Sequence, residues 1–363
     1  MSLSRRSLNS FDWLWFLALL ALAGAGLVTI WSSTEGTGLN SYFGRQAIYL
    51  AFALALYLGL LYLDYHFFAD HITFLYLAGL VLLAAVLFIG RTVHNTKGWI
   101  ALGMLSFQPS ELVKLLVILA LAKYYSEIER EHLNLSELLK GGLIVLVPML
   151  LVVLQGDLGT AVTFVPIFIG LSFIAGLRRK HVLVVLAVAL ACSPLGWMKL
   201  KDYQKGRIQT VFNPSNDPHH LGYQTIQSKI AIGSGKFLGK GFKQGTQGQL
   251  GFLPARHTDF VFAVVSEERG FLGSISVLGL FLFVSIRLLR TAREAKDKIG
   301  GLIVVGVLAL FLFHVMVNVG MVVGLLPITG IPLPLLSAGG SSLISTFLAM
   351  SLCMNIRMRR YVN

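Results

Sequence analysis

The sequence predicts an all-α polytopic membrane protein with ten transmembrane helices. The chain of 363 residues is 55% hydrophobic and only 13% charged, with a mean hydropathy of +0.74. Soluble domains carry about 25% charged residues, so the composition excludes a soluble globule. Apolar runs of about 20 residues recur along the chain, the length that crosses a bilayer. Because lipid offers no hydrogen-bonding partners to the backbone, these runs must be helices.

The ten expected helices follow one another through most of the chain. The first apolar run follows Arg5 and Arg6, and at about 19 residues it is nearer a full span than a cleavable signal. We find no internal repeat and no second soluble domain, which makes residues 1–363 a single integral membrane domain. The spans are roughly 13–31, 44–63, 71–90, 109–126, 141–155, 158–177, 181–198, 263–287, 300–325 and 339–356, with the fourth and fifth short or interrupted.

The distribution of Lys and Arg predicts the orientation. With the N-terminus inside, the inside segments hold sixteen basic residues and the short outside segments three, Arg45, Arg91 and Lys97. Basic residues concentrate in cytoplasmic loops, so both termini are expected in the cytoplasm. The net charge of +13 then reflects topology, and no nucleic-acid partner is expected.

A large extracytoplasmic loop, about 199–262, is expected between the seventh and eighth helices. Tyr223, Ile226 and Ile230 recur there at helical spacing, which favours a short interfacial helix. The glycine- and lysine-rich run 233–243 lacks the spacing of a P-loop. It either binds an anion such as pyrophosphate through Lys236 and Lys240, or it is a basic loop that touches anionic lipid. Taken alone, the run favours the second interpretation.

Asp259 is the candidate catalytic residue. It follows His257 and Thr258 and is the first carboxylate after Asp217, where the loop gives way to an apolar helix. Such an acid either caps the helix or acts on a charged substrate at the membrane surface. Glu267 would lie roughly 12 Å further along a helix, too far to act on the same atom but able to shape the same cavity.

Polar residues inside the expected helices are further candidates. Glu111 and Lys114 lie on one helical face, where they either lock helices together or contact substrate, with equal weight. Asp157 would cap the sixth helix or join Asp259 in binding a cation. His314 and Asn318 favour an interhelical hydrogen-bonding stripe over a site. Pro109 and Ser110 open the fourth helix.

The segment between the last two helices predicts a re-entrant element. Three prolines between Pro327 and Pro334 exclude a helix, yet the segment is apolar. Non-helical backbone at membrane depth must be buried in protein or line a cavity. We expect this segment, with Gly339, Gly340 and Ser341 after it, to face the same outer side as Asp259.

Together these segments resemble the SEDS family of bacterial cell-wall proteins over nearly the whole chain. The resemblance is based on segments spread along the sequence: Gln108–Lys114, Gly156–Ala161, Gly222–Gly251, His257–Phe260, Pro327–Pro334 and Gly339–Ser342. Two positions depart from the family pattern. Ala255 stands where the family usually has Glu, and Gly156 stands where it usually has Pro.

The resemblance implies a function and a set of site residues. It implies a peptidoglycan glycosyltransferase in the bacterial cytoplasmic (inner) membrane that acts on lipid II and the growing glycan strand, with a divalent cation, Mg or Mn. It also implies a class B penicillin-binding transpeptidase and other elongation-complex proteins as partners, and Asp259 as the essential residue. We expect the remaining site residues to be Lys114, Glu111, Arg45, Lys236, Lys240, His257, Thr258 and Ser341 at the substrate, Asp157, Glu267, Pro109, Ser110, Gly339 and Gly340 around the cavity, and Asp259 with Asp157 at the metal.

Alternatives remain open at this point. The N-terminus and the 213–223 segment favour the elongation type of the family over the division type. A lipid II flippase would also need polar groups in a membrane cavity, but near the midplane. Here most of them cluster at the outer face, which favours an enzyme. A purely structural anchor for partner enzymes would leave the placement of Asp259 unexplained.

Overall fold

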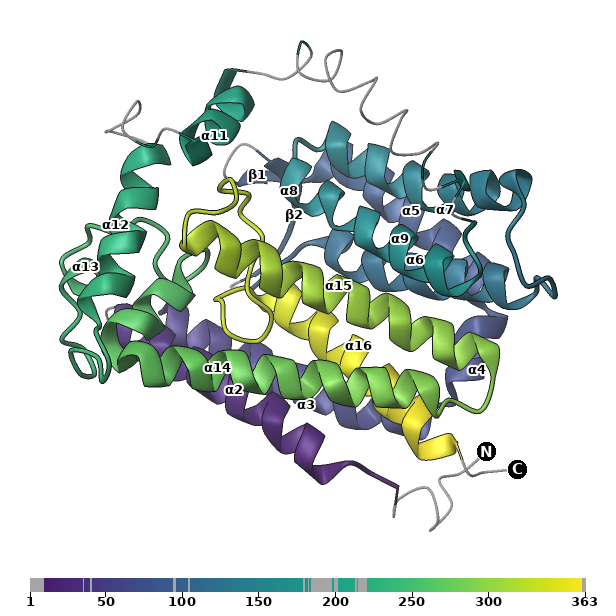
Figure 1. Cartoon of the computed structure of the whole chain (residues 1–363), viewed down its shortest axis with the longest axis horizontal. Helices are drawn as coiled ribbons and strands as arrows, with labels where there is room; N and C mark the ends of the chain where they lie inside the picture. Colours follow the sequence, from purple (N-terminus) through teal and green to yellow (C-terminus); the bar gives the residue numbers. More distant parts are fainter. Residues whose placement is uncertain are drawn as a thin grey trace.

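The computed structural model is a bundle of long helices with smaller elements at one end (Figure 1). It describes residues 10–360 except 35, 40, 94–95, 104, 179, 182, 184–197, 199–201, 213 and 215–220. The helices are α2 (Trp13–Ser33), α3 (Tyr42–Tyr62), α4 (Tyr65–Asp70), α5 (Ile72–Ile89), α6 (Pro109–Ser126), α7 (Leu135–Leu154), α8 (Leu158–Val162), α9 (Phe164–Ile174), α11 (Asp202–Phe212), α12 (Leu221–Ser234), α13 (Thr246–Gln249), α14 (Val261–Arg293), α15 (Lys298–Val322) and α16 (Gly340–Arg359).

Six of the described helices are long and apolar enough to cross a membrane: α2, α3, α5, α7, α14 and α15. They correspond to six of the ten expected spans. The expected seventh span, 181–198, lies almost wholly outside the described residues. The sixth is broken into α8 and α9 at Thr163. The count of ten therefore stays a prediction.

Helices α6 and α16 match the fourth and tenth expected spans, and both lie inside the bundle. In α6, Glu111 and Lys114 are buried, and α16 buries Asn355 and Arg359. Helix α16 packs along α3, and α6 packs against α5 and α15. Both helices bury polar side chains against protein, because polar groups need partners that hydrocarbon does not offer.

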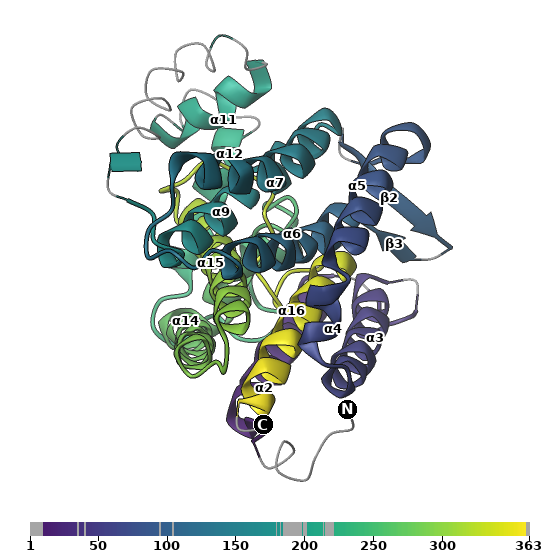
Figure 2. The same ribbon diagram turned by 90° about the vertical axis from the view of Figure 1, so that its right-hand side faces the viewer.

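The all-α prediction is wrong between α5 and α6, where the chain forms a three-stranded antiparallel sheet. Its strands are β1 (Arg91–Val93), β2 (Thr96–Leu102) and β3 (Leu105–Phe107), in the order β1-β2-β3. Figure 2 shows β2 and β3 beside the end of α5. The amide of Lys97 donates to Gln155 O at 2.8 Å, so the sheet is tied to the end of α7. Strands this short gave no clear signal in the sequence.

The start of α2, the first described helix, lies close in space to the end of α16, the last one. Asp12, the N-cap of α2, forms an ion pair with Arg357 near the end of α16, with Oδ2 and Nε 3.2 Å apart. We call this the terminal end of the bundle (Figure 1). The opposite end carries Asp259, the 323–339 segment and the sheet, and we call it the site end. The expected helix around Tyr223–Ile230 is found as α12, which packs against α14.

Candidate active site

Asp259 lies in a tight turn immediately before α14. The amide groups of Thr258, Asp259 and Phe260 all donate to Ala255 O, at 3.1, 3.1 and 3.3 Å. Ala255 itself has φ +49°, a left-handed conformation that non-glycine residues adopt mainly in turns. The N-cap position of α14 is Phe260. Asp259 therefore lies one residue before the position that the capping interpretation requires.

A groove of about 500 Å³ opens beside this turn. It is lined by the end of α2, the start of α3 and the segment 251–257, and its charged lining residues among those described are Arg45 and Arg256. Arg256 is anchored through Nη1, which donates to Gly248 O. Asp259 follows two residues after the last lining residue. The groove thus presents two guanidinium groups, which suit a phosphate-bearing ligand, and Asp259 lies two residues further along the chain.

Aromatic packing positions His257 at the groove. Its ring lies 4.1 Å from the ring of Tyr42, and Arg45 lies over the same tyrosine at 4.9 Å. Burial, together with the positive charges of Arg256 and Arg45, lowers the pKa of His257 below its usual value. The ring is therefore neutral at neutral pH, and it can accept or donate a hydrogen bond without adding charge. Thr258 donates its hydroxyl to Ala255 O at 3.2 Å.

The glycine-rich run 233–243 packs against a break in α14. Helix α14 is interrupted at Gly270, whose φ is +63°. Phe271 N donates to Lys236 O at 2.9 Å, and Lys240 N donates to Glu267 O at 2.9 Å. A Cβ at Gly239 would overlap the carbonyl of Glu268. Glycine is therefore needed because two backbones approach each other, rather than because a ligand approaches the loop.

The loop does hold an anion, and that anion is the carboxylate of Glu267. Glu267 is completely buried and accepts from Lys240 Nζ at 2.7 Å, Gln247 N at 2.9 Å and Gly248 N at 3.0 Å. Lys240 therefore already has a counter-charge, whereas the side chain of Lys236 is exposed. This arrangement favours a structural role for Lys240 and Glu267. Substrate contact by Lys236 and Lys240 stays a prediction.

Asp157 caps α8. Its Oδ1 accepts from Thr160 N at 2.9 Å, and its Oδ2 accepts from Thr160 Oγ1 and Gln108 Nε2, both at 2.8 Å. Helix α8 lies against the segment 326–339, because a Cβ at Gly159 would overlap Thr329 O. The adjacent Gly330 lies near Asp259 Oδ2, 4.0 Å from where its own Cβ would stand. The segment thus brings the two carboxylates to one region of the site end.

Glu111 and Lys114 form a buried cluster with His314. Lys114 Nζ lies 2.7 Å from Glu111 Oε1 and 3.4 Å from His314 Nε2. His314 Nδ1 lies 3.2 Å from Pro332 O, a carbonyl that can only accept, so Nδ1 carries the proton and Nε2 accepts from Lys114. The cluster lines a cavity of about 30 Å³. It ties α6 to α15 and to the proline-rich segment, as the helix-locking alternative predicts.

The remaining predicted residues support the start of α6 and the start of α16. Pro109 and Ser110 form the first turn of α6 and are buried. Ser341 Oγ accepts from Gln108 N, the N-cap residue of α6, at 2.8 Å. A Cβ at Gly340 would overlap the ring of Tyr49. Gly339 N donates to Gln46 Oε1 at 3.1 Å. These contacts give Ser341, Gly339 and Gly340 structural roles, and none of them lines the groove.

The expected cation is not matched by a set of protein ligands. Within the described ranges, no group of three His, Cys, Asp or Glu side chains is arranged to hold a metal ion. Asp157 already accepts three hydrogen bonds, so its oxygens are poor candidates. The Asp259–Asp157 pair therefore does not fit a metal centre built from protein alone.

Three residues outside the predicted set also shape the site. Arg256 and Tyr42 line the groove, and Asn318 Nδ2 donates to Asp259 O at 3.0 Å. A polar side chain in an apolar helix was the sequence signal for Asn318. The partner of Asn318 is a backbone oxygen 59 residues away, and no pattern in the sequence predicts this pairing.

Six apolar helices long enough to cross a membrane, with an acid and two arginines at one end of the bundle, indicate a multi-pass membrane protein with a polar site. The family model described as cell cycle protein, for FtsW, RodA and SpoVE, matches residues 11–362. The chain belongs to this family. The His257–Asp259 turn and the non-helical proline segment contain two of the sequence segments that carry the resemblance.

Individual relatives are similar along their whole length. The peptidoglycan glycosyltransferase RodA of Treponema pallidum is 34% identical, over 98% of this chain and 99% of its own. The peptidoglycan glycosyltransferase MrdB of Escherichia coli K12 is 36% identical, over 95% and 92%. A probable peptidoglycan glycosyltransferase FtsW of Nitrosomonas europaea is 33% identical, over 93% and 90%.

Solved structures share the fold. A chain from a study of how a peptidoglycan synthase complex coordinates polymerization and crosslinking superposes with a TM-score of 0.85 at 32% identity, covering 97% of this chain and 99% of that one. The crystal structure of RodA from Thermus thermophilus gives 0.73 at 31% identity, covering 97% and 98%. These relatives confirm the expected family and an enzyme of the peptidoglycan glycosyltransferase kind.

Proposed function

We propose that this chain polymerises lipid II into glycan strands, with Asp259 as the carboxylate that accepts a proton from the attacking sugar hydroxyl. The observation that supports this most is the position of Asp259, two residues beyond a groove whose described charged lining is Arg45 and Arg256. An acid close along the chain to two groove-lining guanidinium groups supports this proposal, because the reaction needs both a base and stabilisation of negative charge.

Glycosyl transfer makes one bond and breaks another. The acceptor hydroxyl attacks the anomeric carbon and loses its proton, and a carboxylate at hydrogen-bond distance accelerates that step. The bond to the lipid pyrophosphate breaks at the same carbon, and negative charge develops on the leaving oxygen. Arg45 and Arg256 are placed to stabilise this charge, since guanidinium groups bind phosphate oxygens in pairs.

The proposed topology has ten membrane helices with both termini in the cytoplasm and the site end outside. Asp12 and Arg357 lie 3.2 Å apart, which supports an even number of crossings. The excess of Lys and Arg in the proposed inner segments supports this orientation. An outer site would use lipid II after its transfer across the cytoplasmic membrane.

A divalent cation remains part of the proposal only if the substrate supplies most of its ligands. Mg²⁺ is usually held by one or two carboxylates together with substrate phosphates and water. Asp259 is the residue that would hold such an ion, with the substrate supplying further oxygens, and Mn²⁺ would suit the same ligands. When bound, the ion would neutralise charge on the pyrophosphate.

The proposed partner is a transpeptidase of the penicillin-binding class. One solved relative comes from a complex that couples polymerization to crosslinking, and relatives named RodA and MrdB support the elongation type. The division type, named FtsW, is the alternative within the family. Other membrane proteins of the elongation complex would bind the same assembly.

The test uses purified protein, lipid II and a gel that resolves glycan products. Asp259→Asn keeps the shape of the side chain and removes the base, so turnover should fall by roughly a hundredfold to ten-thousandfold. Thr246→Val, which removes a hydroxyl that donates to Glu267 at 3.2 Å, serves as a folded control at the site end. Full-length strands made by Asp259→Asn at the wild-type rate would exclude the proposed base.

The rival function is a flippase for lipid II. It needs a polar path through the membrane depth, and the buried Glu111–Lys114–His314 cavity is about 30 Å³. That volume holds about one water molecule, whereas sites for larger ligands measure several hundred Å³. Translocation of labelled lipid II into liposomes, unchanged by Asp259→Ala, would support the rival.

A further inference from the structure

Three consecutive backbone carbonyls at the candidate active site are each held by a different donor. His257 O accepts from Ala338 N at 2.8 Å, Thr258 O accepts from Ser337 Oγ at 2.6 Å, and Asp259 O accepts from Asn318 Nδ2 at 3.0 Å. The donors come from α15 and from the non-helical segment after it. Every peptide plane of the His257–Asp259 turn is therefore fixed from outside the turn.

Asn318 can make its contacts in only one orientation. Its Nδ2 faces two carbonyl oxygens, those of Asp259 at 3.0 Å and Ile331 at 2.9 Å, and neither can donate a hydrogen bond. The side chain is completely buried, and its Oδ1 has no partner among the described residues. A buried oxygen without a partner costs free energy. The benefit of an asparagine at this position therefore comes from the two hydrogen bonds that its Nδ2 donates.

Ser337 joins the proline segment to the same turn. Its hydroxyl donates to Thr258 O at 2.6 Å and accepts from Leu333 N at 2.9 Å. This hydroxyl thus links the two backbones, next to their direct bond from Ala338 N to His257 O. Ser337 is buried, so water does not readily replace this bridge.

These contacts fix the backbone from which the carboxylate of Asp259 extends. Its amide is anchored on Ala255 O at 3.1 Å and its carbonyl on Asn318, which leaves only side-chain rotation to move the carboxylate. A catalytic group displaced by about 1 Å can lose a hundredfold in rate. We propose that Asn318 and Ser337 are positioning residues that hold Asp259 in its reactive orientation, an inference that depends on the proposed role of Asp259.

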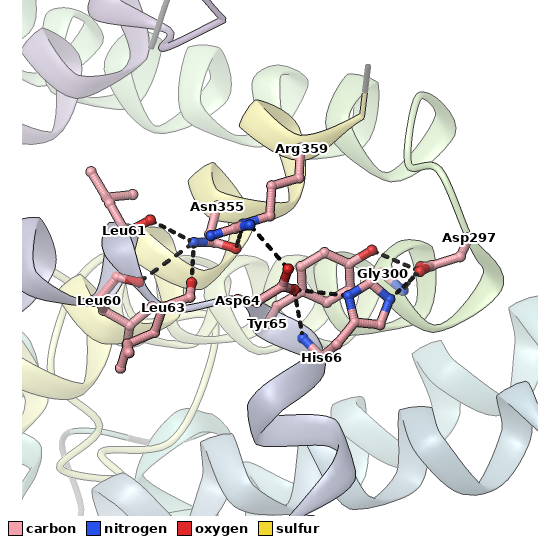
Figure 3. Close-up of polar contacts among 10 residues, drawn as sticks. All are labelled: Leu60, Leu61, Leu63, Asp64, Tyr65, His66, Asp297, Gly300, Asn355 and Arg359. Carbon is pink, nitrogen blue, oxygen red and sulfur yellow. Dashed lines mark hydrogen bonds and ion pairs between the residues drawn. The ribbon is translucent and has the colours of Figure 1, made fainter. Parts of the chain in front are cut away.

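A purely structural role would predict a loss of stability without a specific loss of turnover. The chain offers matched controls for this alternative at the terminal end. Asn355 is buried, and its Nδ2 donates to Leu61 O at 2.9 Å and Leu63 O at 2.6 Å (Figure 3). Ser351 is buried and donates to Tyr57 O at 2.6 Å. Both repeat the chemistry of the site residues at a distance from Asp259.

The experiment compares Asn318→Leu with Asn355→Leu, and Ser337→Ala with Ser351→Ala, in the full-length chain. Turnover and KM for lipid II are measured beside the thermal unfolding midpoint. The site variants should lose roughly tenfold to a hundredfold in turnover with KM nearly unchanged, because a misplaced base weakens only the transition state. The control variants should unfold at similarly lowered temperatures and keep turnover within about twofold, since only their fold is weakened.

Two further variants keep the inference open to failure. Ser337→Thr retains the hydroxyl and should recover most of the turnover lost in Ser337→Ala, even if Asn318→Leu does not fold. Adding Ser337→Ala to Asp259→Asn should cause no further loss, since residues that act through one group are not additive.

The possible failures are distinguishable. If Asp259→Asn alone keeps wild-type turnover, the proposed base is wrong. If Asp259→Asn is inactive while Ser337→Ala and Asn318→Leu keep wild-type turnover, or lose no more than their controls, the positioning role is wrong and the base remains.

Discussion

The two ends of the helix bundle differ in the carboxylates that join their elements. At the terminal end, carboxylates add connections to the neutral bonds of Asn355 and Ser351: Arg359 Nη1 lies 3.0 Å from Asp64 Oδ2, and His66 bridges Asp64 and Asp297 at 2.8 Å each (Figure 3). At the site end, neutral donors hold the carbonyls of residues 257–259. An ion pair shifts the pKa of the group it binds, and a neutral donor to the backbone perturbs a neighbouring carboxylate less. The bonds to these three carbonyls therefore make the turn rigid without adding a further charge to it.

The site end also contains ion pairs, one between Glu111 and Lys114 and one between Lys240 and Glu267. Lys240 and Glu267 are paired at 2.7 Å, with the Glu267 side chain completely buried. The pair lies between the glycine-rich loop and the break in α14, and it fastens the loop to the helix. The residues of each pair neutralise one another, whereas the side chains of Arg45 and Arg256 line the groove.

The largest expected effect comes from breaking the packing at the site end. Gly239 has φ +83°, and a Cβ there would overlap the carbonyl of Glu268. Backbone atoms on both sides cannot yield, so Gly239→Ala should lower the free energy of unfolding by about 3 kcal/mol or more. Thermal or denaturant unfolding in detergent measures the change.

A second glycine in α14 provides the control. A Cβ at Gly279 would meet nothing within 4 Å, and alanine favours a helix by up to about 1 kcal/mol over glycine. Gly279→Ala should therefore keep or raise the unfolding temperature. Equal unfolding temperatures for the two variants would contradict the close approach of the loop to the helix.

A smaller effect is expected from removing a charge at the terminal end. Arg359 is buried, donates to Asp64 Oδ2, and donates through Nε to Asn355 Oδ1 at 3.0 Å. Arg359→Met keeps the length of the side chain and should lower the free energy of unfolding by about 1–3 kcal/mol. Turnover of the folded protein should stay at the wild-type level, because the site end is held separately.

The exposed pair of Lys123 and Glu127, at 3.5 Å, is the matched control. Lys123→Met should change the free energy of unfolding by less than about 0.5 kcal/mol, as exposed pairs generally do. A fall in turnover for Arg359→Met without a fall in stability would show that the two ends are coupled.

The smallest effect is a difference in how the two ends respond to acid. Because the pKa of His257 is lowered in the folded state, protonating this side chain destabilises the fold. The free energy of unfolding that depends on neutral His257 is fully present above the ordinary histidine pKa of about 6.5, and it declines as the pH falls from there. For Asp64, burial raises the pKa, but hydrogen bonds from His66 and the charge of Arg359 outweigh it and lower the pKa. The ionised Asp64 side chain therefore adds to the free energy of unfolding; this addition is fully present above the ordinary aspartate pKa of about 3.9 and is lost as the pH falls below it.

Unfolding temperatures measured across this pH range separate the two ends. His257→Gln should flatten the dependence just below pH ~6.5, and Asp64→Asn should flatten it only below about pH 4. The same flattening from both variants in one pH range would contradict the assignment of separate titrating groups to the two ends.

Local patterns in the sequence predicted much of this molecule. The apolar runs located α2, α3, α5, α7, α14 and α15 to within a few residues at most boundaries. The three prolines identified the non-helical segment before α16. Asp259 was singled out because an acid after a basic loop and before an apolar helix is unusual. Each of these features depends only on residues that are near one another in the sequence. Hydrophobicity, backbone geometry and charge were therefore enough to predict it.

The tertiary structure alone decided which groups these elements bring together. It placed α6 and α16 inside the bundle, gave the glycine-rich loop Glu267 as its anion, and made Asp157 a helix cap. It also placed Asn318 on Asp259 O, across 59 residues, and Ser341 on Gln108 N, across 233. Hydrogen bonds depend on distance and direction in space, and a sequence records neither for residues so far apart. The sequence determined a membrane enzyme with an acid at its boundary, and the fold determined what holds that acid in place.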